Sequence, residues 1–515
     1  MNYKKLLNAL FISGIFIFTS CSKSSVTADE AAMRLVAFDE PAFISSMEVK
    51  ELLDKGGITT KENIPMIAQM LFSDKVEYMS NPEKIGLDLT GKTYMAMSGG
   101  DKGMTGWAIT KIKDVEKLEK MLKEEGNEKF DELEGYKTIV EKDQVIVAWN
   151  ESLLIMMFDQ SKNVKEVFKK YAAALNEEKK PSKSFQKFFD QKADFALMYN
   201  YKKFLELQKS LQSQYGGGSQ KDMEMVNKLT KKMDGSYSIF SCSFENDKVI
   251  VDFANELTEG LKKEMNFFSK EGLPKELLAH VGSNDVSGFV SMNGNIKAYI
   301  DWIIKFSAEK DIFAQAQEET GMDVMRMLKS LKGNVLLSFL GFVPKEISYI
   351  DMEGNESKYT TKIPSISVVT TLSDNYIETV ADSMFKDKKT GNYFTSGSEF
   401  ERIYVAFKPG ILFYTNNEDL LKNPLANANP NLDPEAVKAL EKPVAYYFNL
   451  NKIIGGADNS ELSQKIASKF KYTYGGMDIN GGHAELILNN NGKNSLWTLI
   501  NLTVESTADM ATQFK

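Results

Sequence analysis

Histidine and cysteine are scarce in this sequence of 515 residues, which contains two of each. His280 and His483 are too few for a metal site with three histidine ligands, and a Ser-His-Asp triad would have to use one of them. The cysteines are Cys21 and Cys242. If Cys21 is modified, Cys242 has no partner within the chain, so packing rather than disulfides should hold the fold. We predict structural roles for both histidines, a buried inert thiol at Cys242, and no metal or cofactor.

Long apolar runs are also missing beyond residue 21, where no segment approaches the roughly 20 residues that span a membrane. The formal net charge is −8, with 63 Lys and Arg against 71 Asp and Glu. This mild acidity argues against a nucleic-acid partner. A content of 43% hydrophobic residues is enough for a sizeable core, and the length predicts two or more domains.

The N-terminal segment contains the long apolar run that the rest of the chain lacks. Lys4 and Lys5 precede an apolar run, Leu6–Phe18, and two small residues then stand directly before Cys21. This is the layout of a secretory signal, and it resembles a bacterial lipoprotein signal whose cysteine becomes the acylated first residue. We predict a signal peptide at residues 1–20, lipidation of Cys21, and a tether at residues 21–30. The alternative is an uncleaved membrane helix.

The remaining chain alternates apolar strands with amphipathic helices, which predicts an α+β fold. We expect two related domains, at residues 31–270 and 271–515, each with a mainly antiparallel sheet and packed helices. Two segments rich in β-branched and apolar residues, Leu35–Phe38 and Leu496–Val504, are predicted to be strands. A helix is expected through Met47 and Leu52.

Two short alignments support an internal repeat. Ala196–Phe204 aligns without gaps with Ala445–Ile453, so that Asn200 matches Asn449. Val147–Asn150 similarly resembles Phe413–Asn416. An Asn after a strand can cap the free amides of the next helix, and its recurrence in order favours duplication. A shorter echo pairs Phe38-Asp39 with Met292-Asn293.

Gly86–Thr93 fits the phosphate-loop pattern GxxxxGKT. That motif needs a following helix whose N-terminal amides bind phosphate, whereas Thr93–Met97 favours a strand. We therefore predict a turn and no nucleotide partner. Gly99–Gly106 is likewise expected to be a flexible connection rather than an anion-binding nest.

Two further motifs have weak chemical interpretations. Asp351–Glu356 clusters oxygen ligands that could hold calcium, but it lacks the length of an EF-hand and is better explained as a hairpin turn. His483-Ala484-Glu485 matches the H-x-E of zinc deaminases, but the chain contains no P-C-x-x-C.

The lipoprotein-like start, the Gly86–Leu89 turn before Thr93–Met97, and the two-part layout resemble the large uncharacterised lipoproteins of Bacteroidetes, a family known by a domain of unknown function. The resemblance implies a lipid-anchored protein of the cell envelope of a Gram-negative bacterium, expected at the outer membrane. It supplies no catalytic residues.

Two functions remain open. The first is a non-enzymatic scaffold that is bound to the membrane through Cys21 and binds an envelope protein or polymer. The second is a glycan hydrolase that uses a pair of carboxylates, a chemistry that 71 acidic residues cannot exclude.

Overall fold

The computed structural model forms two compact units, described separately below. The structure describes residues 26–58, 85–100, 103–124, 126, 129–215, 227–228, 230–306, 315, 317–319, 321–350, 356–384, 389–396, 402–421, 428–458 and 460–513. The first unit comprises residues up to 258 together with residues from 490 onward, and the second comprises residues 259–489. The compact units therefore differ from the expected limits of 31–270 and 271–515, chiefly because the last segment belongs with the first unit.

The first unit contains an antiparallel sheet. Its strands are β1 (Phe43–Met47), β2 (Leu87–Asp88), β3 (Thr93–Gly100), β4 (Gly103–Ile112), β5 (Asp131–Leu133), β6 (Tyr136–Glu141), β7 (Val145–Trp149), β8 (Leu153–Asp159), β9 (Phe195–Asn200), β10 (Tyr237–Glu245) and β11 (Lys248–Glu256). The pairings give the order β5-β6-β7-β8-β4-β3-β1-β9-β10-β11, with the short β2 beside the end of β4.

The second unit contains an antiparallel sheet as well. Its strands are β12 (Gly288–Asn293), β13 (Leu331–Ile350), β14 (Glu356–Leu372), β15 (Lys389–Thr390), β16 (Tyr393–Ser396), β17 (Ile403–Lys408), β18 (Ile411–Thr415), β19 (Val444–Phe448), β20 (Phe470–Asp478) and β21 (Gly481–Leu488). Their order is β15-β16-β17-β18-β14-β13-β12-β19-β20-β21. The α+β class is thus confirmed.

The two sheets have the same strand order. Strand β1 corresponds to β12, and the strands β3 to β11 correspond in order to β13 to β21. With this correspondence, every strand pairing of the first sheet recurs in the second. Asn200 ends β9 and accepts a hydrogen bond from the amide of Lys203 at 3.2 Å. Asn449 follows β19 and accepts one from the amide of Lys452 at 3.0 Å. The two asparagines therefore cap helices at matching places, which supports the predicted duplication.

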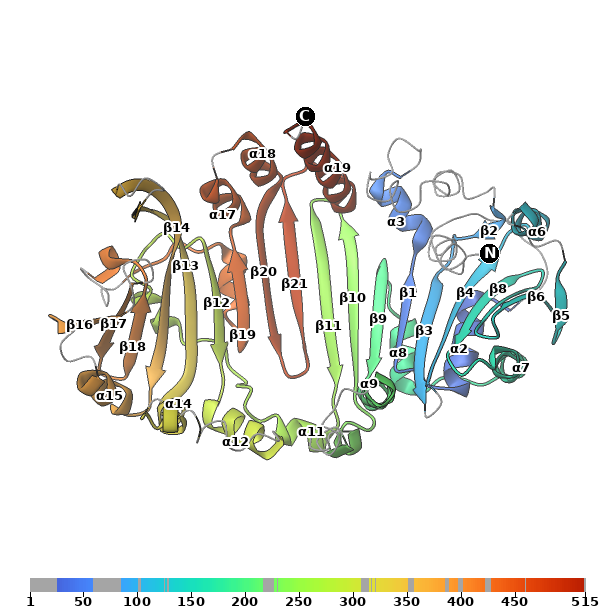
Figure 1. The fold of residues 1–515 in the computed structure, drawn as a ribbon, viewed down its shortest axis with the longest axis horizontal. Helices are drawn as coiled ribbons and strands as arrows, with labels where there is room; N and C mark the ends of the chain where they lie inside the picture. The colour runs from blue at the N-terminus through green and yellow to red at the C-terminus, as the bar shows by residue number, and fades with distance from the viewer. Residues whose placement is uncertain are drawn as a thin grey trace. The chain divides into compact units, whose positions relative to one another are not determined.

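Helices cover the sheet of the first unit (Figure 1). They are α2 (Ala28–Phe38), α3 (Val49–Gly56), α6 (Val115–Glu124), α7 (Val164–Leu175), α8 (Lys183–Phe189), α9 (Tyr201–Tyr215) and α19 (Ser495–Gln513). Residues of α2, α7 and α8 form one apolar core with one face of the sheet. Residues of α3 and α6 form a second core around Trp149. The first unit thus buries apolar side chains in two separate clusters.

The helices of the second unit are shorter. They are α11 (Glu259–Glu264), η3 (Lys275–His280), α12 (Ile296–Phe306), α14 (Val324–Lys329), α15 (Tyr376–Met384), η5 (Glu418–Leu421), α16 (Pro434–Ala439), α17 (Leu450–Ala457) and α18 (Glu461–Lys469). One apolar core includes residues of η3 and α16 and the side chains of Phe289, Leu336, Val369 and Phe413. The sheet side that meets this core is called the core face below.

Several local predictions were wrong. Leu35–Phe38 is helical, because Thr27 and Glu30 form a capping box that starts α2 upstream of it. Leu496–Val504 is also helical, where the amide of Leu496 donates to the side chain of Asn494 at 2.9 Å. Met47 ends β1, and the helix expected through it begins at Val49.

The alignment of Val147–Asn150 with Phe413–Asn416 was also wrong by one strand. Val147 lies on β7, whose place in the second sheet is held by β17, whereas Phe413 lies on β18. The echo of Phe38-Asp39 fails for a similar reason, since Asp39 ends a helix and Asn293 ends a strand. Many strands in this chain are followed by an Asn or Asp, so a short alignment based on this pattern can match strands that are not equivalent.

Among the described residues, no helix has the length and apolarity that a membrane span requires. The segment containing Cys21 and the predicted signal peptide lies outside the described residues.

Candidate binding surface

The central strands of the second unit have apolar side chains on both faces of the sheet. On β12, Phe289 and Ser291 are buried on the core face, while Val290 and Met292 point to the opposite face. On β13, Leu336 and Ser338 are buried and Leu337 points outward. A sheet with one solvated face normally has polar residues there. Here the outward positions are apolar, and we call this side the open face.

The open face carries a continuous row of apolar and aromatic side chains. Direct cross-strand partners share a face, and the pairs Tyr414–Val368, Val368–Leu337, Leu337–Val290 and Val290–Tyr446 follow one another across five strands. We call these five residues the apolar row: Tyr414, Val368, Leu337, Val290 and Tyr446.

Exposure is high in the middle of this face. Val290 and Leu337 are each 39% exposed, and Met292, two residues along β12, is 43% exposed. On the other side of the sheet, Ala436 of α16 belongs to the apolar core together with Tyr447 of β19. Contiguous exposed apolar side chains are characteristic of sites that contact another molecule.

Two aromatic rings lie flat on the open face because the neighbouring positions are glycines. A Cβ at Gly475 would come within 2.7 Å of the ring of Tyr446, and a Cβ at Gly288 within 2.3 Å of the ring of Phe448. The two rings are 6.2 Å apart and tilted by 32°. The glycines therefore let both rings lie against the backbone and extend the apolar surface beyond the row.

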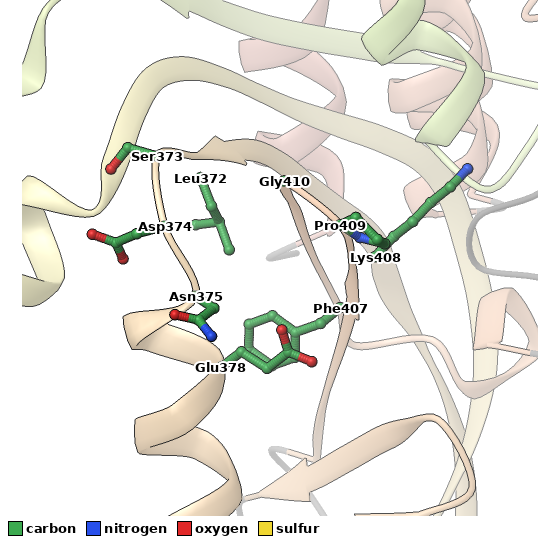
Figure 2. A pocket seen from close by; sticks show the side chains of 9 residues that line it. All are labelled: Leu372, Ser373, Asp374, Asn375, Glu378, Phe407, Lys408, Pro409 and Gly410. Carbon is green, nitrogen blue, oxygen red and sulfur yellow. The ribbon is translucent and has the colours of Figure 1, made fainter.

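A pocket of about 360 Å³ opens where α15 begins, beside the turn between β17 and β18 (Figure 2). It is lined by Leu372, Ser373, Asp374, Asn375, Glu378, Phe407, Lys408, Pro409 and Gly410. Figure 2 shows the side chain of Lys408 directed away from Phe407 and Glu378. The ring of Phe407 thus forms the inner wall, with the side chains of Asn375 and Glu378 beside it at the start of α15 (Figure 2).

The acidic groups at this pocket differ in their surroundings. Asp374 accepts a hydrogen bond from the amide of Tyr376 at 2.9 Å, and this bond, with the Ser330 hydroxyl and the charge of Arg326, lowers the pKa of its carboxyl. The Arg326 guanidinium lies 4.2 Å from the centre of the Tyr376 ring. Within the described part of the chain, the side chain of Glu378 makes no hydrogen bond or ion pair, so its carboxylate remains available to a ligand.

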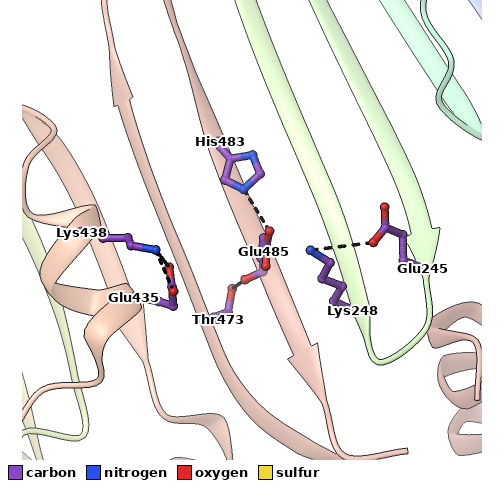
Figure 3. A network of polar contacts seen from close by, with 7 residues as sticks. All are labelled: Glu245, Lys248, Glu435, Lys438, Thr473, His483 and Glu485. Carbon is purple, nitrogen blue, oxygen red and sulfur yellow. Dashed lines mark hydrogen bonds and ion pairs between the residues drawn. The ribbon is translucent and has the colours of Figure 1, made fainter. Parts of the chain in front are cut away.

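His483 lies on β21 and contacts Glu485. Its Nε2 is 3.2 Å from Oε1 of Glu485, and the Thr473 hydroxyl donates to the backbone oxygen of Glu485 at 2.9 Å (Figure 3). Burial and the nearby Glu485 raise the pKa of the Tyr474 phenol. Together these contacts form a polar patch on the last two strands of the second unit.

His280 ends η3 and is buried. Burial, followed by the charge of Lys408, lowers the pKa of its imidazole, which keeps it neutral near pH 7. The two histidines lie on different elements, η3 and β21, and no described residue joins either of them to a metal-binding group of three or more His, Cys, Asp or Glu.

The residues of the GxxxxGKT pattern make internal contacts. A Cβ at Gly86 would lie 2.1 Å from the backbone oxygen of Asp114, so glycine is needed for close packing against the start of α6. Asp88 pairs with Lys111 at 2.7 Å, and Lys92 donates to the backbone oxygen of Gln191. Strand β3 follows the motif, as predicted, where a phosphate site would need a helix.

Glu48 and Glu51, at the start of α3, are an acidic pair whose carboxyl pKa values shift in opposite directions. Burial, then a hydrogen bond with Glu51, raises the pKa of Glu48, while Lys55 and Glu48 lower that of Glu51. Lys55 also binds the buried Asp194 at 2.6 Å. Direct hydrogen bonding leaves no room for a sugar, because glycosidase carboxyl groups stand about 5 Å or more apart.

Other predicted site residues have structural positions or lie outside the description. Cys242 lies on β10 and is partly rather than fully buried; burial and then Asp194 raise the pKa of its thiol. The candidate calcium residues Asp351–Asn355 lie outside the described residues, although the flanking Ile350 and Glu356 pair as in a hairpin.

Sequence reasoning missed both the apolar row and the pocket. The alternation was visible in Phe289–Met292 and Val335–Phe339, where neither set of alternate positions is polar enough for a solvated face. The pocket gave no such signal, because α15 and the turn at Pro409 are about 35 residues apart in the chain.

Comparison with known proteins identifies a family but no activity. The chain belongs to the family described as "Domain of unknown function (DUF4836)", which matches residues 39–454. No curated protein matches. A solved structure titled "Structure of crystal form IV of TP0453" is similar to 44% of this chain and 96% of that one, with 12% identity and a TM-score of 0.21.

Proposed function

We propose that this protein is a non-enzymatic binding protein of the cell envelope, anchored by a lipid on Cys21, whose second unit binds a partner protein through the open face. The observation that supports this proposal most directly is the apolar row, since Val290 and Leu337 are each 39% exposed in the middle of a sheet. Polar side chains would cost less there in a protein without a partner.

The chemistry of the row favours a partner protein with apolar side chains over a charged polymer. Val290, Leu337 and Val368 offer aliphatic surface, and Tyr414 and Tyr446 add rings at the two ends of the row. Burying such surface contributes about 25 cal/mol per Å², and aromatic residues are enriched in protein interfaces.

A site-specific crosslink tests this proposal. A photoreactive amino acid at Leu337 should capture a defined envelope protein in the native host, identified by mass spectrometry. The double variant Val290→Thr, Val368→Thr keeps β-branched side chains, so it should preserve the sheet while reducing the binding of the purified partner at least tenfold. An unchanged affinity of this variant would exclude the row as the interface.

A matched control uses the same substitution at an exposed position outside the row. Val437 on α16 is exposed on the other side of the sheet, so Val437→Thr should leave partner binding within twofold of the parent. If Val437→Thr weakens binding as much as the row variant, the loss reflects general destabilisation rather than a contact.

The anchor is tested separately. Replacing Cys21 with Ser should release the protein from membranes or leave an unprocessed precursor, because a serine cannot carry the thioether-linked lipid. Cell fractionation and the mobility of the processed form measure this. Unchanged membrane retention and processing in Cys21→Ser would contradict lipidation.

A further inference from the structure

The pocket at Phe407 occupies a place that the first unit fills with its own chain. The register of the sheets makes Phe407, at the end of β17, the counterpart of Trp149, at the end of β7. The turns after them also match, since the Ile112 amide donates to the Ser152 oxygen at 2.8 Å and the Leu372 amide to the Gly410 oxygen at 2.8 Å.

In the first unit this place is closed. Trp149 is fully buried, and Phe130 contacts it edge to face with ring centres 4.8 Å apart. The indole Nε1 donates to Oε1 of Glu119 on α6 at 3.3 Å. The arrangement therefore combines an aromatic ring in an apolar site with a carboxylate that accepts its N–H.

In the second unit the smaller Phe407 leaves the pocket open, but a carboxylate is again present on the corresponding helix. Glu378 is the third residue of α15, whereas Glu119 is the fifth of α6, so the acceptor comes from the matching helix at a different position. Glu378 and the pocket-lining Asn375 have no side-chain hydrogen bond among the described residues.

We propose that the pocket at Phe407 binds a planar aromatic group with an N–H donor, such as an indole, with its ring against Phe407 and its N–H bonded to Glu378. The ligand would contribute an aromatic ring and an N–H donor, as the side chain of Trp149 does within the first unit. Aromatic pairs with ring centres 4.5–7 Å apart are favourable, and a hydrogen bond to a charged acceptor strengthens with exclusion of water. This inference is independent of the proposed partner at the apolar row.

The test uses 5-fluoroindole with the full-length chain, observed by ¹⁹F NMR. Saturable line broadening is expected. 5-Fluoro-1-methylindole, which lacks the N–H, should bind about tenfold more weakly, the ratio that one hydrogen bond typically supplies. No saturable binding of 5-fluoroindole, or equal binding of the two compounds, would overturn the proposal.

Variants locate the binding site. Phe407→Trp places the residue of the first unit in the second and should abolish binding, while Glu378→Met should weaken 5-fluoroindole about tenfold and leave the methylated compound unaffected. Lys438→Met is the control, since this exposed side chain on α16 is not among the residues that line the pocket, and the affinity of this variant for 5-fluoroindole should stay within twofold of the parent. Undiminished binding to a folded Phe407→Trp protein would show that the pocket is not the site.

Discussion

The two units use one strand order to produce different surfaces. Trp149 in the first unit lies in an apolar cluster with α3 and α6, whereas its counterpart Phe407 borders a pocket. Likewise, Ser45 in the first unit is 8% exposed, and its counterpart Val290 is 39% exposed. Strand order therefore sets where side chains stand, while the helices and the side-chain sizes decide whether a position becomes core or contact surface.

The largest expected effect comes from truncating the two matching aromatic residues. Trp149→Ala removes a fully buried ring and should lower the free energy of unfolding of the first unit by about 3–5 kcal/mol. Phe407→Ala should cost about 1–2 kcal/mol, because its ring is only partly buried. Hydrogen exchange followed by mass spectrometry reads each unit separately. Equal losses would mean that the pocket wall is as well packed as the core.

A smaller effect, which depends on pH, is expected from the Asp88–Lys111 ion pair of the first unit. Burial opposes ionisation of Asp88, but Lys111 and Thr90 outweigh it and hold the pKa of its carboxyl below its ordinary value. Its stabilisation is therefore present above the unfolded-state pKa of about 4 and is lost as the pH falls through the folded-state value. The matching residue in the second unit is Lys332, so the loss of this ion pair should destabilise only the first unit.

Asp88→Asn measures that contribution. At pH 7 the variant should be less stable by about 1 kcal/mol, a figure reduced for the partly exposed Lys111. The difference from the parent should shrink below pH 4, where the parent also loses the ion pair. A difference that stays constant from pH 7 to pH 3 would assign the loss to packing instead.

An effect of similar size should be shared by both units. Asn200→Ala and Asn449→Ala each remove one side-chain acceptor at a helix start and should cost about 1 kcal/mol without unfolding the protein. Thermal unfolding of the two variants gives the comparison, with Asn200→Asp and Asn449→Asp as controls that retain a cap. A loss in only one variant would show that the matching caps are not energetically equivalent.

The sequence predicted features that depend on neighbouring residues. The caps at Asn200 and Asn449 follow from the local properties of these residues. The strand after Gly86–Thr93 was predictable for the same reason.

Features set by distant contacts were not predictable. Leu496–Val504 has a strand-like composition but is helical, because α19 packs against α3, where Trp497 meets Gly57. The open face has the same alternation as a doubly covered strand, so periodicity alone could not tell which side lacks a cover. The α+β class could be predicted from the pattern of helices and strands alone. The open face could not, because it depends on how all the elements pack.

The segment 490–513 has a consequence for the order in which the molecule can mature. The Asn494 side chain donates to the Phe244 oxygen at 2.9 Å, and the Gly492 amide donates to the side chain of Asp247 at 3.0 Å. The hairpin of β10 and β11 therefore gains these contacts only after residues about 250 positions later have been synthesised. During synthesis, the first unit emerges first but is completed last, so the second unit must fold, or be kept from aggregating, while the first unit is still incomplete.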